Sequence, residues 1–198
     1  MGKISAADWY RSGRRNGGNK FEGRKGLIAR AARTCLERKG VAKTSIADIT
    51  REVDITRELF YYYYPNKDSV VEAVLDSYVA DAHALLVKGV QAVEDEPEAL
   101  LLQVVHILRV WMSTDDSAAV PMLDVLRESG RWTKMLYRVA GEALESVRGT
   151  SLLAEDDALE EADACGRKLS LVGTMSAVLC APELSDAELA RGIAPLFY

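Results

Sequence analysis

Apolar residues recur at helical spacing along nearly the whole chain. Between residues 24 and 39 they fall three or four positions apart, which is the period of one face of an α-helix. The period returns at about 98–113, 117–129, 131–148, 155–181 and 185–194, and Gly, Pro and polar clusters separate these segments. No stretch alternates apolar and polar residues as an exposed strand would. The sequence therefore predicts an all-α fold.

The composition is that of a globular protein with a hydrophobic core. The 198 residues are 48% hydrophobic and 28% charged, a length that corresponds to one or two domains. No long apolar run occurs, so we expect neither a membrane span nor a secretory signal, and a cytoplasmic location. Cys35, Cys165 and Cys180 form no CxxC motif or Cys/His cluster, which argues against disulfides and a zinc site.

Charge is unevenly distributed along the chain. Residues 1–68 contain 15 Lys and Arg against 8 Asp and Glu, whereas residues 69–198 contain 10 against 22. The first third therefore has a net charge of +7 and the remainder a net charge of −12. This asymmetry indicates that the first third binds a polyanion.

Helix start and stop signals divide the first third into short segments. Gly40 ends the first helix, directly after two basic residues. Ser45, with Asp48 three residues later, provides a capping box for a second helix, and Thr56 caps a third. A proline ends the third helix, and Asn66 caps a longer one that extends to about residue 92.

Residues 44–67 are thus predicted to form a helix, a tight turn and a second helix, an arrangement whose second helix enters the DNA major groove. Phe60 and Tyr64 are i, i+4 neighbours that face inward, which leaves Tyr61–Tyr63 on the other faces unless Tyr62 joins the core. Exposed aromatic rings are costly unless they bind a partner. A phosphate backbone is suitable, because tyrosine hydroxyls and Lys67 can donate to phosphate oxygens.

The segment from about Arg24 to Val74 resembles the N-terminal DNA-binding domain of TetR-type (TetR/AcrR) transcriptional repressors. In that family an aliphatic first helix precedes the pattern T-[TS]-[VI]-x-[DE]-I-A-x-x-A-G-V-[ST]-x-x-x-[LF]-Y-x-[HY]-[FY]-x-x-K-[DE]. The resemblance implies an N-terminal three-helix helix-turn-helix domain and a C-terminal helical domain that binds a ligand and dimerises. The matching residues are Thr44, Ser45, Ile46, Asp48, Ile49, Ile55, Thr56, Phe60, Tyr61, Tyr63, Tyr64, Lys67 and Asp68.

The resemblance also implies roles for individual side chains. Arg57 is the first candidate for guanine, since its guanidinium fork can pair with O6 and N7. Glu58 is acidic on the same surface, and it either reads cytosine N4 or discriminates against other sequences. The base-reading candidates are Arg57, Glu58 and Tyr62, and the phosphate-binding candidates are Thr44, Ser45, Tyr61, Tyr63 and Lys67.

The sequence departs from the family pattern in the turn. Val53-Asp54 stands where the family has Ala-Gly, and Asp adopts the left-handed conformation less readily than Gly, so a slightly altered turn is expected. Glu58-Leu59 also replaces the small residue that is common before the aromatic step.

Three parts are predicted along the chain: a flexible basic arm at 1–20, the helix-turn-helix domain at 21–66, and a helical domain for effector binding and dimerisation at 67–198. The basic side chains of the arm either lie along DNA or remain solvated. They are Arg11, Arg14, Arg15 and Lys20.

A stripe of small residues marks one face of the predicted helix at 155–181. Such a stripe allows another helix to approach closely. The partner is either the same helix across a two-fold axis, which the resemblance favours, or a neighbour in the same chain. The stripe consists of Gly166, Ser170, Gly173 and Ala177.

Several aromatic, Met and His side chains of the C-terminal part are candidates for an effector pocket, because such side chains adapt to apolar ligands. Each of them also has a plain explanation as core. His83 and His106 have no second ligand at helical spacing, so no metal site and no cofactor is expected. The pocket candidates are His106, Trp111, Met112, Met122, Met135 and Tyr137.

Together these features predict a sequence-specific DNA-binding transcriptional regulator: a repressor that binds an inverted-repeat operator as a homodimer and is released by a small-molecule effector. The absence of a Gly-rich phosphate loop, a nucleophile elbow and paired His/acid motifs argues against an enzyme. A helical protein-interaction module without operator specificity is the alternative. A steep salt dependence of DNA binding would separate the two.

Overall fold

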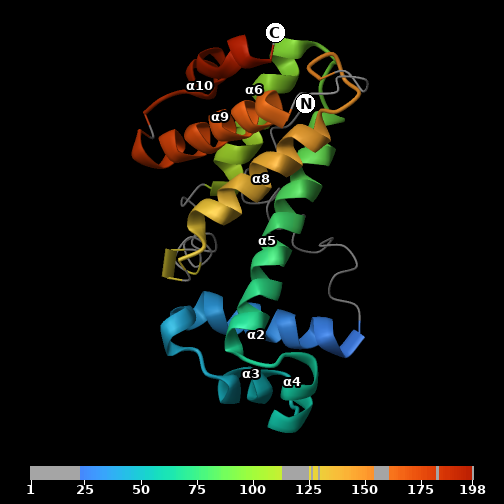
Figure 1. Cartoon of the computed structure of the whole chain (residues 1–198), viewed down its shortest axis with the longest axis vertical. Helices are drawn as coiled ribbons and strands as arrows, with labels where there is room; N and C mark the ends of the chain where they lie inside the picture. Colours follow the sequence, from blue (N-terminus) through green and yellow to red (C-terminus); the bar gives the residue numbers. More distant parts are fainter. Residues whose placement is uncertain are drawn as a thin grey trace, which may run out of the picture. The chain divides into compact units, whose positions relative to one another are not determined.

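The computed structural model describes residues 23–112, 125, 127–128, 130–153, 161–181 and 183–197. All regular elements within these ranges are helices, so the all-α prediction is confirmed (Figure 1). They are α2 (Gly23–Lys43), α3 (Ile46–Glu52), α4 (Arg57–Tyr63), α5 (Lys67–Val90), α6 (Pro97–Met112), α8 (Trp132–Ser146), α9 (Glu161–Cys180), α10 (Asp186–Ile193) and a 3₁₀ turn at Ala194–Leu196. No helix among the described residues is long and apolar enough to cross a membrane.

Some of the predicted features lie outside the described residues. They are the N-terminal arm, most of the predicted helix at 117–129, the start of the predicted helix at 155–181, and Met122. The other predicted helices agree with the observed ones to within a few residues at each end.

Helix α2 has one buried apolar stripe, which includes Ile28, Ala32 and Leu36. Gly40 interrupts the helix with φ 77° and ψ 169°, a left-handed backbone conformation that glycine adopts without steric cost. The predicted end at Gly40 is therefore confirmed, and residues 41–43 form one further helical turn.

The predicted caps begin the next three helices. At α3 the Ser45 hydroxyl accepts from the Asp48 amide at 3.2 Å, and the Asp48 carboxylate accepts from the Ser45 amide at 2.8 Å. At α4 the Thr56 hydroxyl accepts from the Leu59 amide at 3.3 Å. The Asn66 side-chain oxygen accepts from the Ser69 amide at 2.8 Å at the start of α5. Each cap satisfies a backbone N–H that has no partner within the helix.

Contacts divide the chain into two compact units. One, here called the head, contains the described residues of 23–81 and 125–132; the other, here called the body, contains those of 82–112 and 133–197. The core of the head is formed by side chains from α2 to α5 that are almost completely buried. They include Ile28, Leu36, Ile49, Phe60 and Val70.

A buried polar cluster joins α2 to α5 inside the head. The Arg33 guanidinium donates to Asp81 at 2.7 Å and to Glu37 at 2.9 Å, and it stacks 4.2 Å from the centroid of the Tyr78 ring. Burial alone would lower the pKa of Arg33, but the negative charge of Asp81 raises it above its usual value. Because a buried charge without its partner is strongly destabilising, this cluster holds the two helices in one relative position.

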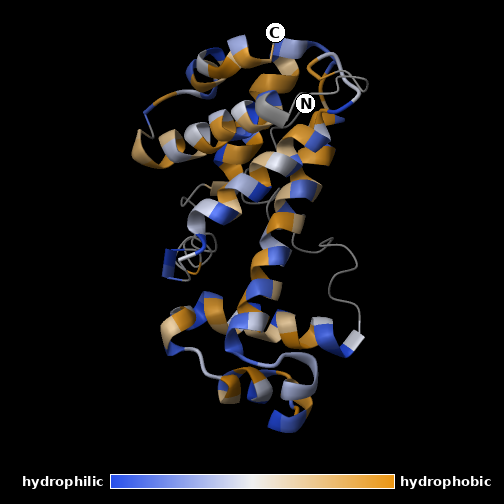
Figure 2. Ribbon diagram, in the orientation of Figure 1, coloured by the Kyte–Doolittle hydropathy of each residue, from blue (hydrophilic) through white to orange (hydrophobic). Residues whose placement is uncertain are grey.

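In the body, α6 packs against α9 and α10. Helix α6 is largely buried, and Figure 2 shows hydrophobic residues recurring along the helices of this unit with hydrophilic residues between them. At the protein surface the Asp186 carboxylate, in the first turn of α10, pairs with His106 at 2.8 Å and with Arg109. Apolar burial and this ion pair together join α6 to α10.

Candidate nucleic-acid interface

The turn between α3 and α4 has the left-handed residue that a helix-turn-helix requires. Asp54 has φ 52°, and it is the one residue other than glycine with a positive φ in the described part of the chain. The Ile55 amide donates to the Thr50 carbonyl at 3.0 Å and closes the turn. Asp thus occupies the conformation that Gly provides in the family pattern, at the steric cost of a Cβ atom.

The inner face of α4 is anchored by two rings, as predicted. Phe60 is fully buried and Tyr64 is 4% exposed, with ring centroids 5.9 Å apart. The Tyr64 hydroxyl donates to the Lys25 carbonyl of α2 at 3.1 Å. Burial raises the pKa of Tyr64 to about 12. These rings fix the orientation of α4 in the head.

The outer face of α4 presents aromatic and charged side chains to solvent. Tyr62 is 79% exposed and Tyr61 is 51% exposed, so Tyr62 does not join the core. Tyr63 is half-buried and meets Tyr62 edge to face, with 5.0 Å between the ring centroids. Arg57 and Glu58 are also exposed. This face can offer hydroxyl, guanidinium and carboxylate groups to a partner at the same time.

Glu58 is held over the first turn of α4. Its carboxylate accepts from its own backbone N–H and from the Thr56 hydroxyl, and both hydrogen bonds lower its pKa. Glu58 is therefore ionised at neutral pH. An ionised carboxylate beside a phosphate backbone is unfavourable unless it accepts a hydrogen bond from a base edge.

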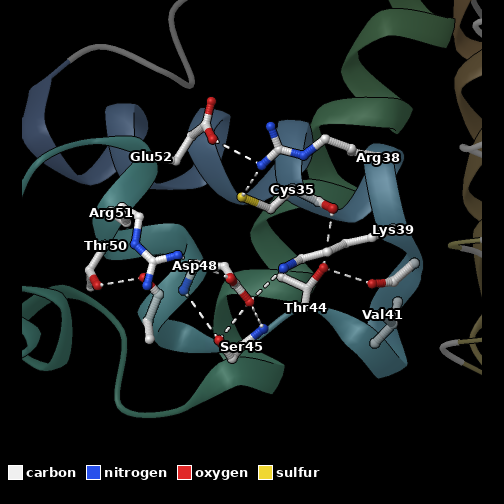
Figure 3. Close-up of polar contacts among 12 residues, drawn as sticks. Cys35, Arg38, Lys39, Val41, Thr44, Ser45, Asp48, Thr50, Arg51 and Glu52 are labelled. Atoms are coloured by element: carbon white, nitrogen blue, oxygen red, sulfur yellow. Dashed lines mark hydrogen bonds and ion pairs between the residues drawn. The ribbon is translucent and has the colours of Figure 1, made fainter.

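At the start of α3, Asp48 is the centre of a polar cluster (Figure 3). Its carboxylate contacts the Lys39 ammonium at 2.7 Å and accepts from the Ser45 hydroxyl at 2.6 Å. The Lys39 ammonium and the hydroxyl and amide of Ser45 hold the pKa of Asp48 well below its usual value. Ser45 itself is exposed, at the position predicted for a phosphate contact.

Like Ser45, whose hydroxyl and amide both donate to Asp48, two further predicted phosphate ligands have internal hydrogen-bond partners. Thr44 is 2% exposed. Its hydroxyl shares its proton between two carbonyl oxygens, that of Gly40 at 2.7 Å and that of Cys35 at 3.2 Å. Its hydroxyl proton is therefore used within the head. Lys67 is half-buried, and its ammonium donates to the Val41 carbonyl. An ammonium group has further protons, so Lys67 can still donate to a phosphate.

The residues predicted for an effector pocket divide into two groups in the body. Trp111, Met112 and Met135 are buried, and the Trp111 indole N–H has no hydrogen-bond partner among the described residues. His106 and Tyr137 lie at the surface, His106 beside Asp186 and Tyr137 beneath the Lys168 ammonium. The structure thus brings three of the candidates into the core and leaves two outside it.

The small-residue stripe of α9 lies on its exposed side. Gly166 and Gly173 are exposed, and no atom of the described residues would lie within 4 Å of a Cβ added at either position. Ser170 and Ala177 are half-buried. The opposite side of the helix, with Leu171 and Met175, is buried in the body. Among the described residues the stripe is therefore uncovered at its two glycines and partly covered at Ser170 and Ala177.

Comparison with known proteins matches the head to one family of DNA-binding proteins. The family model described as "Bacterial regulatory proteins, tetR family" matches residues 28–74. The regulator EthR of Mycolicibacterium smegmatis is 26% identical over 95 residues, which are 48% of this chain and 44% of EthR. TtgR of Pseudomonas putida is 36% identical over 73 residues, which are 37% of this chain and 34% of TtgR. The chain thus spans less than half the length of these relatives.

A solved structure extends the likeness in fold to most of the chain. The TetR-family repressor AlkX from a Dietzia strain has a TM-score of 0.61 and 16% identity, over 91% of this chain and 97% of AlkX. The likeness shows that the helices of head and body follow a fold that this repressor also has. The fold prediction, a helix-turn-helix domain followed by a C-terminal helical domain, is confirmed.

Proposed function

We propose that this chain is a sequence-specific transcriptional repressor, because residues 28–74 match the family model of the tetR bacterial regulatory proteins. It would bind an inverted-repeat operator as a homodimer and leave it when a small molecule binds the body. The observation that supports this best is the two-sided helix α4, with Phe60 buried and with Arg57 and Tyr62 exposed. A rigid inner face holds the outer face in place for the major groove.

The exposed side of α4 provides the proposed base contacts. Arg57 reads a guanine through its guanidinium, and Tyr62 contacts a neighbouring base edge. Glu58 accepts from a cytosine amino group, which replaces the hydrogen bond from the Thr56 hydroxyl that it accepts in the free protein. Each of these contacts distinguishes one base pair from others.

The proposed phosphate contacts surround α4. Tyr61, Tyr63 and Lys67 donate to phosphate oxygens and set the position of the head on the duplex. Ser45 joins them by turning its hydroxyl proton from the Asp48 carboxylate to a phosphate oxygen. Thr44 supports this surface from inside, since its hydroxyl closes the loop that precedes Ser45.

Homodimerisation is proposed to use the exposed stripe of α9. Two copies related by a two-fold axis would cover Gly166 and Gly173 with each other's helices. Replacement of Gly173 by Leu places a large side chain in the proposed helix–helix contact, and its Cβ atom would lie more than 4 Å from the neighbouring atoms of the described residues. Analytical ultracentrifugation should show a dimer for the wild type and a monomer for this variant. If the wild type and the variant form dimers with the same dissociation constant, the proposed interface is wrong.

The effector is proposed to bind beside Trp111, Met112 and Met135 in the body, with Met122, His106 and Tyr137 as further candidates. The unpartnered indole N–H of Trp111 can donate to an oxygen atom of a mainly apolar ligand. Such a ligand releases the repressor only if it binds the DNA-free arrangement more tightly than the DNA-bound one. Once a ligand is found by screening, Trp111→Phe tests the site, because it retains an aromatic ring and removes the donor.

Selection of duplexes from a random DNA library by the purified protein tests the proposed function. At two salt concentrations, enrichment of an inverted repeat with half-sites about one helical turn apart, ~34–36 Å, is expected. Affinity should also fall steeply as salt rises, because phosphate neutralisation releases counterions. Weak retention without enrichment at either salt concentration would favour a helical protein-interaction module instead.

A further inference from the structure

Two side chains that precede α8 hold the start of the helix-turn-helix in the head. The Glu128 carboxylate accepts from the backbone amides of Val41 at 2.7 Å and Ala42 at 3.4 Å. Three residues later Arg131 forms an ion pair with Glu72, in the second turn of α5. A residue more than eighty positions away in sequence therefore fixes residues 40–44, here called the loop, which lead into α3.

The backbone of this loop is shaped to receive a carboxylate. The positive φ of Gly40, 77°, is followed by two successive N–H groups that point to the same Glu128 oxygen. Successive amides of this kind form an anion-binding concavity. A Cβ atom at Gly40 would lie 2.8 Å from the Glu128 carboxylate, so a larger residue there would displace this side chain from the two amides.

The two elements that Glu128 and Arg131 hold also carry proposed phosphate contacts. The loop at 40–44 ends at Ser45, and α5 begins with Lys67. The Lys67 ammonium donates to the Val41 carbonyl, so the loop and the start of α5 are also joined to each other. Ser45 and Lys67 therefore belong to one hydrogen-bonded unit that includes Glu128 and Arg131.

We propose that Glu128 and Arg131 are positioning residues for DNA binding, which preorganise Ser45 and Lys67 to meet phosphates. This inference rests on the proposed function. A fixed loop loses less conformational entropy when DNA binds, and affinity rises accordingly. Arg131 is followed directly by Trp132, the first residue of α8, so the ion pair with Glu72 joins the residue before this helix to α5.

Four variants test the positioning role on the duplex that the wild type selects. Glu128→Gln removes the negative charge that strengthens the hydrogen bonds from the Val41 and Ala42 amides. Arg131→Glu reverses the charge of one member of the ion pair with Glu72. Each should weaken binding about fivefold, and the double variant Arg131→Glu/Glu72→Arg should recover most of the affinity. Glu145→Gln, an exposed carboxylate of the body that pairs with Arg148, is the matched control and should bind as the wild type does.

The salt dependence separates positioning from direct contact. A lost phosphate contact lowers the slope of log affinity against log salt by about 1, whereas a lost positioning residue leaves the slope unchanged. Hydrogen exchange of the full chain supplies a second readout. The amides of Val41 and Ala42 should exchange faster in Glu128→Gln than in the wild type, and those of α8 should not.

The outcomes separate this inference from the proposed function. A wild-type protein that selects no duplex overturns the proposed function. A wild type that binds, together with unchanged affinity in Glu128→Gln and Arg131→Glu, overturns only the positioning role. If the double variant Arg131→Glu/Glu72→Arg does not restore binding, the weaker binding of Arg131→Glu results from its changed charge. The ion pair between Arg131 and Glu72 then has no positioning role.

Discussion

The head and the body differ in where their proposed functional side chains lie relative to the core. In the head, Arg57 and Tyr62 are exposed, whereas Phe60 on the same short helix is buried. In the body, the main effector candidates Trp111 and Met135 are themselves buried. Substitutions can therefore separate function from stability in the head, but in the body the same side chains serve both.

The largest effect is expected from truncation of the core ring of the head. Phe60→Ala should lower the free energy of unfolding by about 3–5 kcal/mol, because it removes a fully buried ring and leaves a cavity. Tyr62→Ala, two residues away and 79% exposed, should change it by less than about 0.5 kcal/mol. Urea unfolding of both variants measures this. Equal destabilisation would show that the two faces of α4 are not separate.

In the body a single substitution should change both properties. Met135→Ala is expected to lower the free energy of unfolding by about 2–4 kcal/mol and also to weaken binding of an effector found by screening. Tyr137→Ala, on the same helix but 39% exposed, serves as the control with a smaller loss of stability. Unfolding and ligand titration are measured on the same samples. Loss of stability without any loss of effector affinity would remove Met135 from the proposed site.

At the proposed DNA contacts of the head, substitutions should change DNA binding, and stability should stay unchanged for the exposed Arg57 but fall for the half-buried Lys67, which also donates to the Val41 carbonyl. Arg57→Ala should reduce the preference for one base pair by about 1–3 kcal/mol. Lys67→Ala should weaken binding to cognate and scrambled duplexes alike and lower the salt slope by about 1. Competition titrations at several salt concentrations compare the two variants. If Arg57→Ala weakens binding to the cognate and the scrambled duplex by the same factor, Arg57 does not read a base.

Features of the head that depend on neighbours in sequence were predictable from the sequence. The caps at Ser45 and Thr56 each act within three residues, and the inward position of Tyr64 follows from its i, i+4 relation to Phe60. The base-reading and phosphate-binding roles stay predictions, because they concern a partner that the structure does not contain.

Features that depend on distant contacts could not be predicted in this way. The internal role of the Thr44 hydroxyl and the bond from Lys67 to Val41 arise only when the loop folds back on itself. The contact of Glu128 with the loop joins residues 87 positions apart, and no local pattern indicates it. Gly40 is the one local signal in this loop, and in the sequence it indicates only a helix end.

A smaller effect is expected at the turn between α3 and α4. Asp54→Gly should raise the free energy of unfolding by up to about 1 kcal/mol, since glycine adopts the positive φ of 52° without the steric cost of a Cβ atom. Asp54→Ala should lower it, because Ala lacks a side chain that can hydrogen-bond locally in this conformation. Thermal unfolding of the two variants is compared with the wild type. A destabilised glycine variant would show that the Asp54 side chain contributes more than its backbone strain costs.

The smallest effect compares the same capping box in the two units. In α3 the box consists of Ser45 and Asp48, and in α10 it consists of Ser185 and Glu188. Hydrogen bonds from the capping serine lower the pKa of each carboxylate. Asp48 also pairs with Lys39, which lowers its pKa further, whereas Glu188 has no lysine in its box. An acid whose pKa is lower in the folded state stabilises the protein above its unfolded pKa. That contribution is lost as pH falls through the folded pKa.

Urea unfolding between neutral pH and about pH 2 measures these contributions, since unfolded acidic side chains titrate near pH 4. As pH falls, the free energy of unfolding should decrease less in Asp48→Asn than in the wild type. The difference from the wild type should be smaller for Glu188→Gln, because Glu188 has no lysine partner in its capping box. Glu188 is exposed and the Asp48 side chain is 21% exposed, so solvent screening keeps the differences small. Curves that fall in parallel for the wild type and Asp48→Asn would show that the Lys39 pair contributes nothing to the stability of the head.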